Sequence, residues 1–318
     1  MINNMKRKTI FLIMVTMTFA FLNVAMAQEN VNENYENILK QFNCERNIVY
    51  KTVNGEELDM ILFFPKEKKY KKTPVMIYTH GGGWGKGDKY SVLKKDFIGT
   101  LKTLTENGIA CAAIEYRLTR LDTSTVFDCV VDCKDAARFL MKNATKFGLD
   151  TSHMGVWGGS AGGHLSLMTA LGHNEDFIGD PELKYFVPHF KCVASYFPLT
   201  SFMHPELLKK SNFENPQRFI PMFGGLFEEK KELARLVSPA EYLTKNSPPI
   251  LLLHGDNDEV LPYNLSTYFI SVAKQNGADA KLITVKGAGH GFKGKNISPS
   301  MSEINQISAD FIIKHLAH

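Results

Sequence analysis

Residues 153–171 read HMGVWGGSAGGHLSLMTAL and hold a serine between two different patterns. Residues 153–157 are a short apolar run typical of a buried strand, and residues 164–171 are typical of a helix. Between them, Gly158-Gly159-Ser160-Ala161-Gly162 fits G-x-S-x-G in its strand–turn–helix setting. Side chains at the flanking glycines would collide across so tight a turn. The motif predicts a serine hydroxyl on a strained backbone, beside the free N–H groups that begin the helix. The alternative is a glycine-rich turn without chemistry.

Short apolar runs alternate with amphipathic stretches on both sides of this motif. This alternation predicts a mostly parallel central sheet with helices on both faces, which is an α/β fold. Two earlier extended segments, separated by the hairpin signal Asn54-Gly55, are expected to form an antiparallel edge. Strands are expected at 48–53, 58–64, 75–79, 109–114, 153–157, 192–197, 250–254 and 282–285, and helices at 90–106, 127–147, 164–171, 263–275 and 304–316.

The alternation breaks between residues 200 and 236, where phenylalanines are interspersed with lysines and glutamates. We interpret this stretch as a small helical insertion lying over the sheet and not as a separate domain. Residues 45–318 are therefore expected to form one α/β domain, preceded by an exposed polar lead-in at 28–44. The phenylalanines of the insertion are Phe202, Phe213, Phe219, Phe223 and Phe227.

The composition is that of an ordinary globular protein. The chain has 318 residues, of which 44% are hydrophobic and 22% charged. These values exclude collagen, low-complexity disorder and a polytopic membrane protein. The formal net charge is +4, and Lys6, Arg7 and Lys8 supply three of these charges, which leaves +1 for the rest. A nearly neutral body gives no reason to expect a nucleic-acid partner.

Residues 1–27 have the pattern of a secretory signal peptide. Lys6-Arg7-Lys8 precedes a largely apolar stretch, and Ala25-Met26-Ala27 gives a small-x-small cleavage site. The alternative is an uncleaved membrane anchor, for which the apolar run is short. We predict cleavage, a secreted or periplasmic protein, and no stable membrane insertion afterwards.

The five cysteines are Cys44, Cys111, Cys129, Cys133 and Cys192. An odd number leaves at least one thiol unpaired, and the spacing matches no zinc site. We expect small apolar core residues, with one disulfide left open as an alternative.

A glycine-rich loop, His80-Gly81-Gly82-Gly83-Trp84, follows the strand expected at 75–79. Backbone N–H groups without intervening side chains can approach a ligand closely and stabilise the oxyanion of acyl transfer. A phosphate loop is disfavoured because Asp88 stands where its lysine belongs. A dinucleotide loop is disfavoured because Lys86 replaces its third glycine. A plain flexible loop remains the alternative.

Asp258 and His290 each follow a predicted strand near the C-terminus. A serine nucleophile needs an imidazole base, and the base needs an acid to fix its tautomer. The order Ser160, Asp258, His290 suits this fold, and all three residues are expected at the carboxyl edge of the sheet. Asp256 and Glu259 are the alternative acids.

The other histidines are expected to have structural roles. His254 ends a buried strand, His164 lies one helical turn after Ser160, and His80 is expected to shape the glycine loop. No H-E-x-x-H motif occurs, and Asp256-Asn257-Asp258 lacks the rest of a calcium loop. We therefore expect no metal and no cofactor.

Taken together, these motifs resemble the α/β-hydrolase serine esterases, in particular the feruloyl and acetyl-xylan esterase-like (BD-FAE-like) branch near the hormone-sensitive-lipase group. The resemblance implies Ser160 as nucleophile, Asp258 as acid and His290 as base. It also implies an oxyanion hole formed by the N–H groups of Gly82, Gly83 and Ala161. Relatives often have a glycine-containing turn where this chain has Phe197-Pro198-Leu199-Thr200. The stretches that carry the resemblance are 80–84, 116–118, 158–164, 238–243, 254–262 and 287–292.

The predicted function is that of a secreted serine carboxylesterase acting through a Ser-His-Asp triad and an acyl-enzyme. Its substrate would be a small-molecule or polysaccharide-linked ester, with acetyl or feruloyl groups on plant polysaccharide suggested by the resemblance and the compartment. The alternatives are a formamidase-like amidase, a prolyl-oligopeptidase-like peptidase and a non-catalytic binding protein. Trp84, Trp157 and Tyr196 either line an acyl pocket or pack in the core.

Overall fold

The computed structural model describes residues 34–211 and 213–317. The signal peptide expected at residues 1–27 lies outside the described residues. The chain divides into two units, Met1–Asn43 and Cys44–His318, and residues 34–39 of the first unit are helical. No helix within the described ranges combines the length and apolar character needed to cross a membrane.

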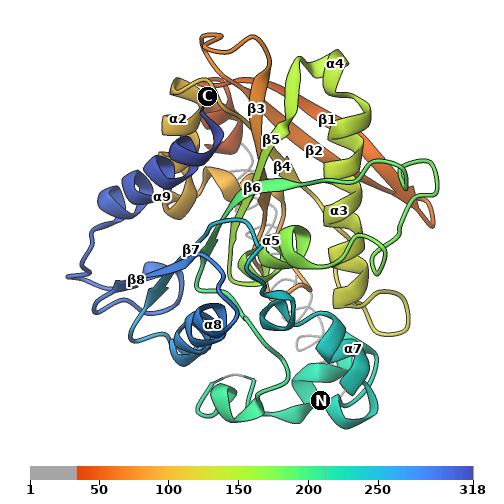
Figure 1. Ribbon diagram of the computed structural model, residues 1–318, viewed down its shortest axis with the longest axis vertical. Helices are drawn as coiled ribbons and strands as arrows, with labels where there is room; N and C mark the ends of the chain where they lie inside the picture. Colours follow the sequence, from red (N-terminus) through yellow and green to blue (C-terminus); the bar gives the residue numbers. More distant parts are fainter. Residues whose placement is uncertain (1–33, 212, 318) are drawn as a thin grey trace, which may run out of the picture. The chain divides into compact units, whose positions relative to one another are not determined.

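An eight-stranded sheet forms the centre of the second unit, with the strand order β1-β2-β4-β3-β5-β6-β7-β8 (Figure 1). β2 runs antiparallel to β4, and every neighbouring pair from β4 to β8 is parallel. The predicted mostly parallel sheet with its antiparallel edge is therefore confirmed. The strands are β1 (Asn43–Val53), β2 (Glu56–Phe64), β3 (Thr73–Thr79), β4 (Ala110–Ile114), β5 (Leu149–Gly159), β6 (Phe190–Tyr196), β7 (Ile250–Gly255) and β8 (Ala280–Val285).

The turn between β1 and β2 follows from its two residues. Asn54 has φ 52° and Gly55 has φ 82°. Two successive positive φ values characterise the tight hairpin turn that Asn-Gly favours. The hairpin signal in the sequence is thus confirmed.

Helices cover both faces of the sheet, as the alternating sequence pattern predicts. α2 packs on α9, and α9 crosses β5, β6 and β7, whereas α3 packs on α5, which crosses β3, β5 and β6 (Figure 1). Successive side chains of β3 point to opposite faces of the sheet and pack against different helices. Ile77 lies in the core with α3, and the Tyr78 ring contacts Phe97 of α2. The longer helices are α2 (Lys95–Glu106), α3 (Val126–Lys142), α5 (Ala161–Leu171), α8 (Asn264–Gln275) and α9 (Met301–Leu316).

Two of the expected helices are interrupted. The stretch expected at 90–106 begins as a 3-10 turn, η1 (Lys89–Leu93), and continues as α2. The stretch expected at 127–147 divides into α3 and the short α4 (Ala144–Phe147). Asn143 stands at this second break, where its side-chain amide donates to the carbonyl of Phe139 and ends α3.

The region 200–236 forms short helical turns rather than long helices. Phe202, Phe219 and Phe223 are buried, with the Phe202 and Phe223 ring centres 4.9 Å apart. Because these rings pack on one another and on Trp84, they extend the core instead of lining a ligand site. The turns are η2 (Pro205–Leu208), η3 (Pro216–Phe219), α6 (Ile220–Phe223), η4 (Phe227–Glu229) and α7 (Lys231–Leu236), followed by η5 (Pro239–Tyr242).

Four of the five cysteines confirm the expected packing role. Cys111, Cys129, Cys133 and Cys192 are fully buried and carry free thiols. Burial raises the pKa of the Cys111 thiol to about 12, so this thiol stays protonated at neutral pH.

Candidate active site

Ser160 stands on the sharp turn between β5 and α5. Its backbone has φ 59° and ψ −123°, which is costly for any residue other than glycine. Its N–H donates to the carbonyl of Tyr196 on the neighbouring strand, at 2.9 Å. The strained turn predicted from G-x-S-x-G is therefore present, and it holds the serine hydroxyl clear of the sheet.

The glycines around Ser160 are required mainly by the neighbouring strand. A Cβ atom on Gly158 would contact the Thr79 carbonyl and lie 2.7 Å from the Gly162 carbonyl. A Cβ atom on Gly162 would also contact the Thr79 carbonyl and lie 2.6 Å from the backbone carbon of His80. The expected collision across the turn is thus only part of the reason that glycine is required at these two positions. The backbone at the end of β3 lies even closer to both Cβ positions.

We predict that Gly162→Ala lowers the free energy of unfolding by about 1–3 kcal/mol, or more, because backbone on β3 cannot give way cheaply. Gly289→Ala is the matched control, since its Cβ would meet nothing closer than 3.6 Å. Denaturant unfolding of both variants measures the difference. Equal losses for the two would contradict the packing argument.

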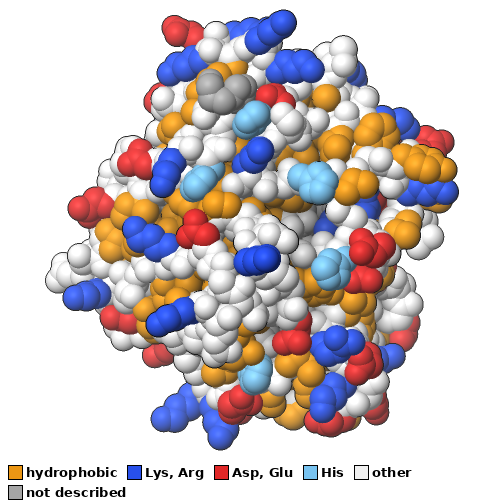
Figure 2. Space-filling view, in the orientation of Figure 1, with side chains coloured by type: hydrophobic (Ala, Val, Ile, Leu, Met, Phe, Trp, Pro, Cys, Tyr) orange, Lys and Arg blue, Asp and Glu red, His pale blue; other side chains and the backbone are white. Residues whose placement is uncertain are grey.

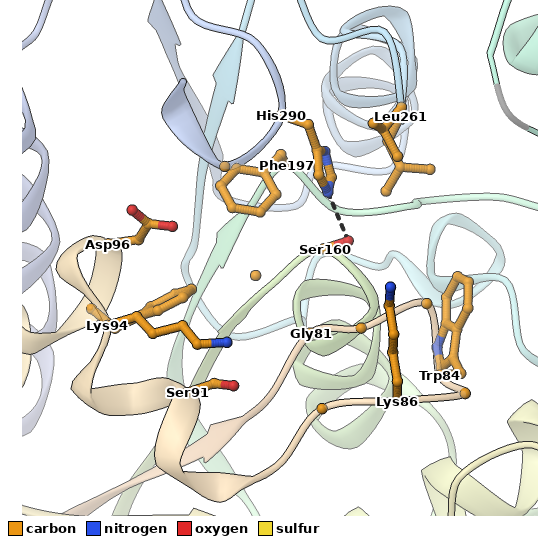
Figure 3. Close-up of a pocket in the computed structure, with 18 of the residues that line it drawn as sticks. Gly81, Trp84, Lys86, Ser91, Lys94, Asp96, Ser160, Phe197, Leu261 and His290 are labelled. Carbon is orange, nitrogen blue, oxygen red and sulfur yellow. Dashed lines mark hydrogen bonds between the residues drawn. The ribbon is translucent and has the colours of Figure 1, made fainter. Parts of the chain in front are cut away.

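Three side chains from different loops form one hydrogen-bonded chain. His290 Nε2 lies 2.9 Å from Ser160 Oγ (Figure 3), and His290 Nδ1 lies 2.8 Å from Asp258 Oδ2. An ionised carboxylate only accepts hydrogen bonds, so Nδ1 of the neutral imidazole must donate to it. Nε2 then accepts the proton of the Ser160 hydroxyl, which is the arrangement a general base requires.

The carboxylate of Asp258 is held from several directions. Its Oδ1 accepts from the N–H groups of Val260 and Leu261, both at 2.9 Å. Burial alone would raise its pKa, but hydrogen bonds from His254 and His290 outweigh burial and hold the pKa well below the usual range. Asp258 is therefore ionised at neutral pH, and its orientation is fixed.

Sequence reasoning did not anticipate the contact between His254 and Asp258. His254 Nε2 lies 3.3 Å from Asp258 Oδ2 and 2.9 Å from the carbonyl oxygen of Leu261. The other ring nitrogen, Nδ1, is hydrogen-bonded to the hydroxyl of Ser266. His254 therefore has the structural role expected for it, because it contacts the Asp258 carboxylate and the Leu261 carbonyl and so helps to fix the loop that carries the acid. The only sequence signal was the spacing of four residues between the two.

The alternative acids and bases lie elsewhere. Asp256 accepts from the N–H of Gly287 at 2.7 Å and ties two loops together, and Glu259 is exposed. His164 accepts from the indole of Trp84 and donates to the carbonyl of Val237. Burial lowers the pKa of His164 to about 4 against the opposing hydrogen bond to Val237, so its role is packing.

The glycine loop lies directly against Ser160. A Cβ atom on Gly81 would come within 2.8 Å of the Gly159 carbonyl, and Gly82 has φ 127°, so both positions require glycine. His80 Nδ1 lies 2.9 Å from the Gly81 carbonyl. The Tyr116 hydroxyl donates to the His80 carbonyl, and the rings of these two residues are stacked. His80 therefore shapes the loop, as expected from the sequence.

A cavity of about 800 Å³ opens in front of Ser160 and His290. Gly82 and Gly83 form part of its wall, while Ala161 follows Ser160 as the first residue of α5. Figure 3 shows the side chains of Phe197 and Leu261 on either side of His290. Within the described ranges, no group of three His, Cys, Asp or Glu side chains has the arrangement of a metal site.

Phe197 has an unusual backbone at the edge of this cavity. Its φ is 37°, a region that bulky residues rarely adopt. Its ring centre lies 4.8 Å from His290 and 4.8 Å from Phe292, and all three side chains pack together. A glycine-containing turn would adopt this backbone conformation without strain. Phe197 adopts it at a cost in backbone strain, and its ring forms the cavity wall beside His290.

The sequence alone does not decide whether each aromatic residue near the site lines the cavity or packs in the core, and the structure shows both cases. Trp84 and Phe213 line the cavity. Trp157 and Tyr196 are fully buried beneath it, where both rings contact Phe97. For these two, core packing is the correct interpretation.

Comparison with known proteins identifies the family to which this site belongs. The BD-FAE family matches residues 58–272, which is more than half of the chain. The chain belongs to the BD-FAE family. The resemblance drawn from the motifs is thereby confirmed, and the eight-stranded sheet is that of an α/β-hydrolase.

Several curated relatives of this BD-FAE protein are named esterases. The probable isoprenylcysteine alpha-carbonyl methylesterase ICME of Oryza sativa is 30% identical over 77% of this chain and 57% of its own length. The esterase LipC of Mycobacterium tuberculosis is 27% identical over 71% of this chain and 55% of its own length. The chain spans about half the length of these relatives.

Solved structures share the fold. Native esterase 2 of Thermogutta terrifontis superimposes with a TM-score of 0.71 at 23% identity, covering 87% of this chain and 94% of that one. A truncated carbohydrate esterase from gut microbiota gives the same TM-score and identity, covering 87% and 97%. At this identity the likeness extends to the fold alone.

Proposed function

We propose that this protein is a serine carboxylesterase that works through an acyl-enzyme. The observation that supports the proposal most strongly is the hydrogen-bonded chain from Ser160 through His290 to Asp258, with the serine facing a cavity. The names of the curated relatives point to the same chemistry.

The proposed reaction begins with transfer of the Ser160 proton to His290 Nε2 while the serine oxygen attacks the ester carbonyl. Asp258 holds the imidazole in the required tautomer and stabilises the imidazolium. The N–H groups of Gly82, Gly83 and Ala161 are proposed to stabilise the oxyanion. His290 then protonates the departing alcohol, and a water molecule activated by the same imidazole releases the acid.

The compartment and the natural substrate are finer parts of the proposal. The leader pattern at residues 1–27 supports an exported enzyme. Family membership supports acetyl or feruloyl groups on plant polysaccharide as substrates. A cavity of about 800 Å³ is large enough for a small acyl group together with part of its alcohol.

Paired substrates with the same acyl group test the reaction type. We expect 4-nitrophenyl acetate to be hydrolysed with kcat/KM of at least about 10⁴ M⁻¹s⁻¹ and 4-nitroacetanilide far more slowly. Comparable rates on the two would support an amidase instead. Turnover of neither, together with tight binding of both, would support a binding protein.

A further inference from the structure

The cavity in front of Ser160 has an unbalanced charge. Its walls include Lys86, Lys94, Arg218 and Lys293, whereas Asp96 is the one carboxylate among the described residues that line it. On the face drawn in Figure 2, acidic and basic side chains are interspersed. The lining of this cavity therefore carries an excess of positive charge.

These four cations come from separate parts of the chain and converge on one space. Lys86 belongs to the glycine loop, Lys94 precedes α2, Arg218 lies in η3 and Lys293 follows His290. In Figure 3 the side chains of Lys86 and Lys94 extend into the space in front of Ser160 from two directions.

The four cations also differ from basic residues elsewhere in the fold that form ion pairs. Lys89 pairs with Asp59 at 2.6 Å, and Arg117 pairs with Asp132 at 2.7 Å. By contrast, within the described ranges no ion pair involves the four cavity cations. Unpaired cations facing one cavity concentrate anions there, because the low-dielectric walls focus their field.

Asp96 only partly offsets this charge. It is half-buried on the first turn of α2, where burial raises its pKa against the opposing effect of Lys95, Lys94 and Lys293. With Asp96 ionised, the four cations still leave the wall with a net charge of +3.

We propose that the preferred substrates are esters whose alcohol portion carries a negative charge, such as acyl groups on an acidic sugar. This inference rests on the proposed esterase function and narrows its substrate class. The anionic group would lie among Lys86, Lys94, Arg218 and Lys293 while the ester carbonyl faces Ser160. A neutral alcohol of the same size would gain nothing from these cations.

The test compares 4-acetoxybenzoate, which carries a carboxylate on its alcohol portion, with the neutral 4-acetoxybenzamide. The wild type is compared with a variant in which Lys86, Lys94 and Lys293 are each changed to Gln. We expect the charged-to-neutral ratio of kcat/KM to be at least about tenfold higher in the wild type. Differences in leaving-group reactivity cancel because both enzymes receive the same two esters.

A matched control removes the same number of charges elsewhere. Lys191, Lys274 and Lys314 are exposed and lie outside the cavity, so changing them to Gln should leave the ratio at the wild-type value. Raising the salt concentration from about 0.01 to about 1 M should reduce the wild-type preference and leave the cavity variant almost unchanged.

A binding measurement separates this inference from the esterase proposal. Calorimetry with Ser160→Ala protein should show 4-hydroxybenzoate binding at least about tenfold more tightly than 4-hydroxybenzamide, with the difference removed by the three cavity substitutions. Equal ratios in all enzymes, or equal binding of the two phenols, would overturn the charge inference. Failure of the wild type to cleave either ester, with charge-selective binding retained, would refute only the esterase proposal.

Discussion

Ser160→Ala is expected to lower kcat for 4-nitrophenyl acetate by about 10⁴–10⁶-fold, because no other hydroxyl replaces the one that His290 contacts. The residual rate would come from the oxyanion donors and from substrate binding. Steady-state hydrolysis with freshly purified protein measures the loss, and thermal unfolding shows that the variant is folded.

Ser166→Ala is the matched control for this substitution. Ser166 lies on the same helix, but its hydroxyl is buried and donates to the Gly163 carbonyl at 2.8 Å. Its loss should change activity by no more than a few-fold. Ser160→Ala activity within tenfold of the wild type would exclude Ser160 as the nucleophile.

Asp258→Asn is expected to lower kcat by about 10⁴-fold. An amide N–H at the position of Oδ2 would require Nδ1 of His290 to accept a hydrogen bond. The ring proton would then lie on Nε2, which could no longer accept the Ser160 proton. The fold should remain intact, because the carbonyl oxygen of asparagine can still accept from Val260 and Leu261.

Asp256→Asn provides the same chemical change two residues away. Asp256 accepts from Gly287 N–H, and the asparagine oxygen can do the same, so we expect activity within a few-fold of the wild type. A large loss at Asp256 and a small loss at Asp258 would reverse the assignment of the acid.

The sequence predicted the parts of the site that are encoded locally. G-x-S-x-G after an apolar strand defines a backbone turn, so the position of Ser160 could be inferred from five residues and their flanks. Asp258 and His290 follow strands of a parallel sheet, and such strand ends meet at one edge. The chain order and the expected topology were therefore enough to bring three distant residues together.

Features that depend on tertiary contacts were not predictable in this way. The bracing of Asp258 by His254 requires the buried position of both side chains, which no local pattern specifies. The cavity cations lie on four segments whose separation in sequence conceals their convergence. Asn143 likewise interrupts a pattern that looks continuous, because its side-chain hydrogen bond competes with the helix.

Trp157 and Tyr196 show the same limit for aromatic residues. An aromatic side chain near a catalytic motif serves either a pocket or the core, and only its place on one face of a strand decides. Both of these side chains are fully buried, and their rings contact Phe97.

Covalent labelling of Ser160 tests the central claim most directly. The protein is treated with a fluorophosphonate, digested, and its peptides are identified by mass spectrometry. We predict one adduct per chain, located on Ser160, absent from Ser160→Ala and formed much more slowly in Asp258→Asn. A wild-type protein that hydrolyses esters without forming this adduct, or that carries it on another residue, would contradict the mechanism.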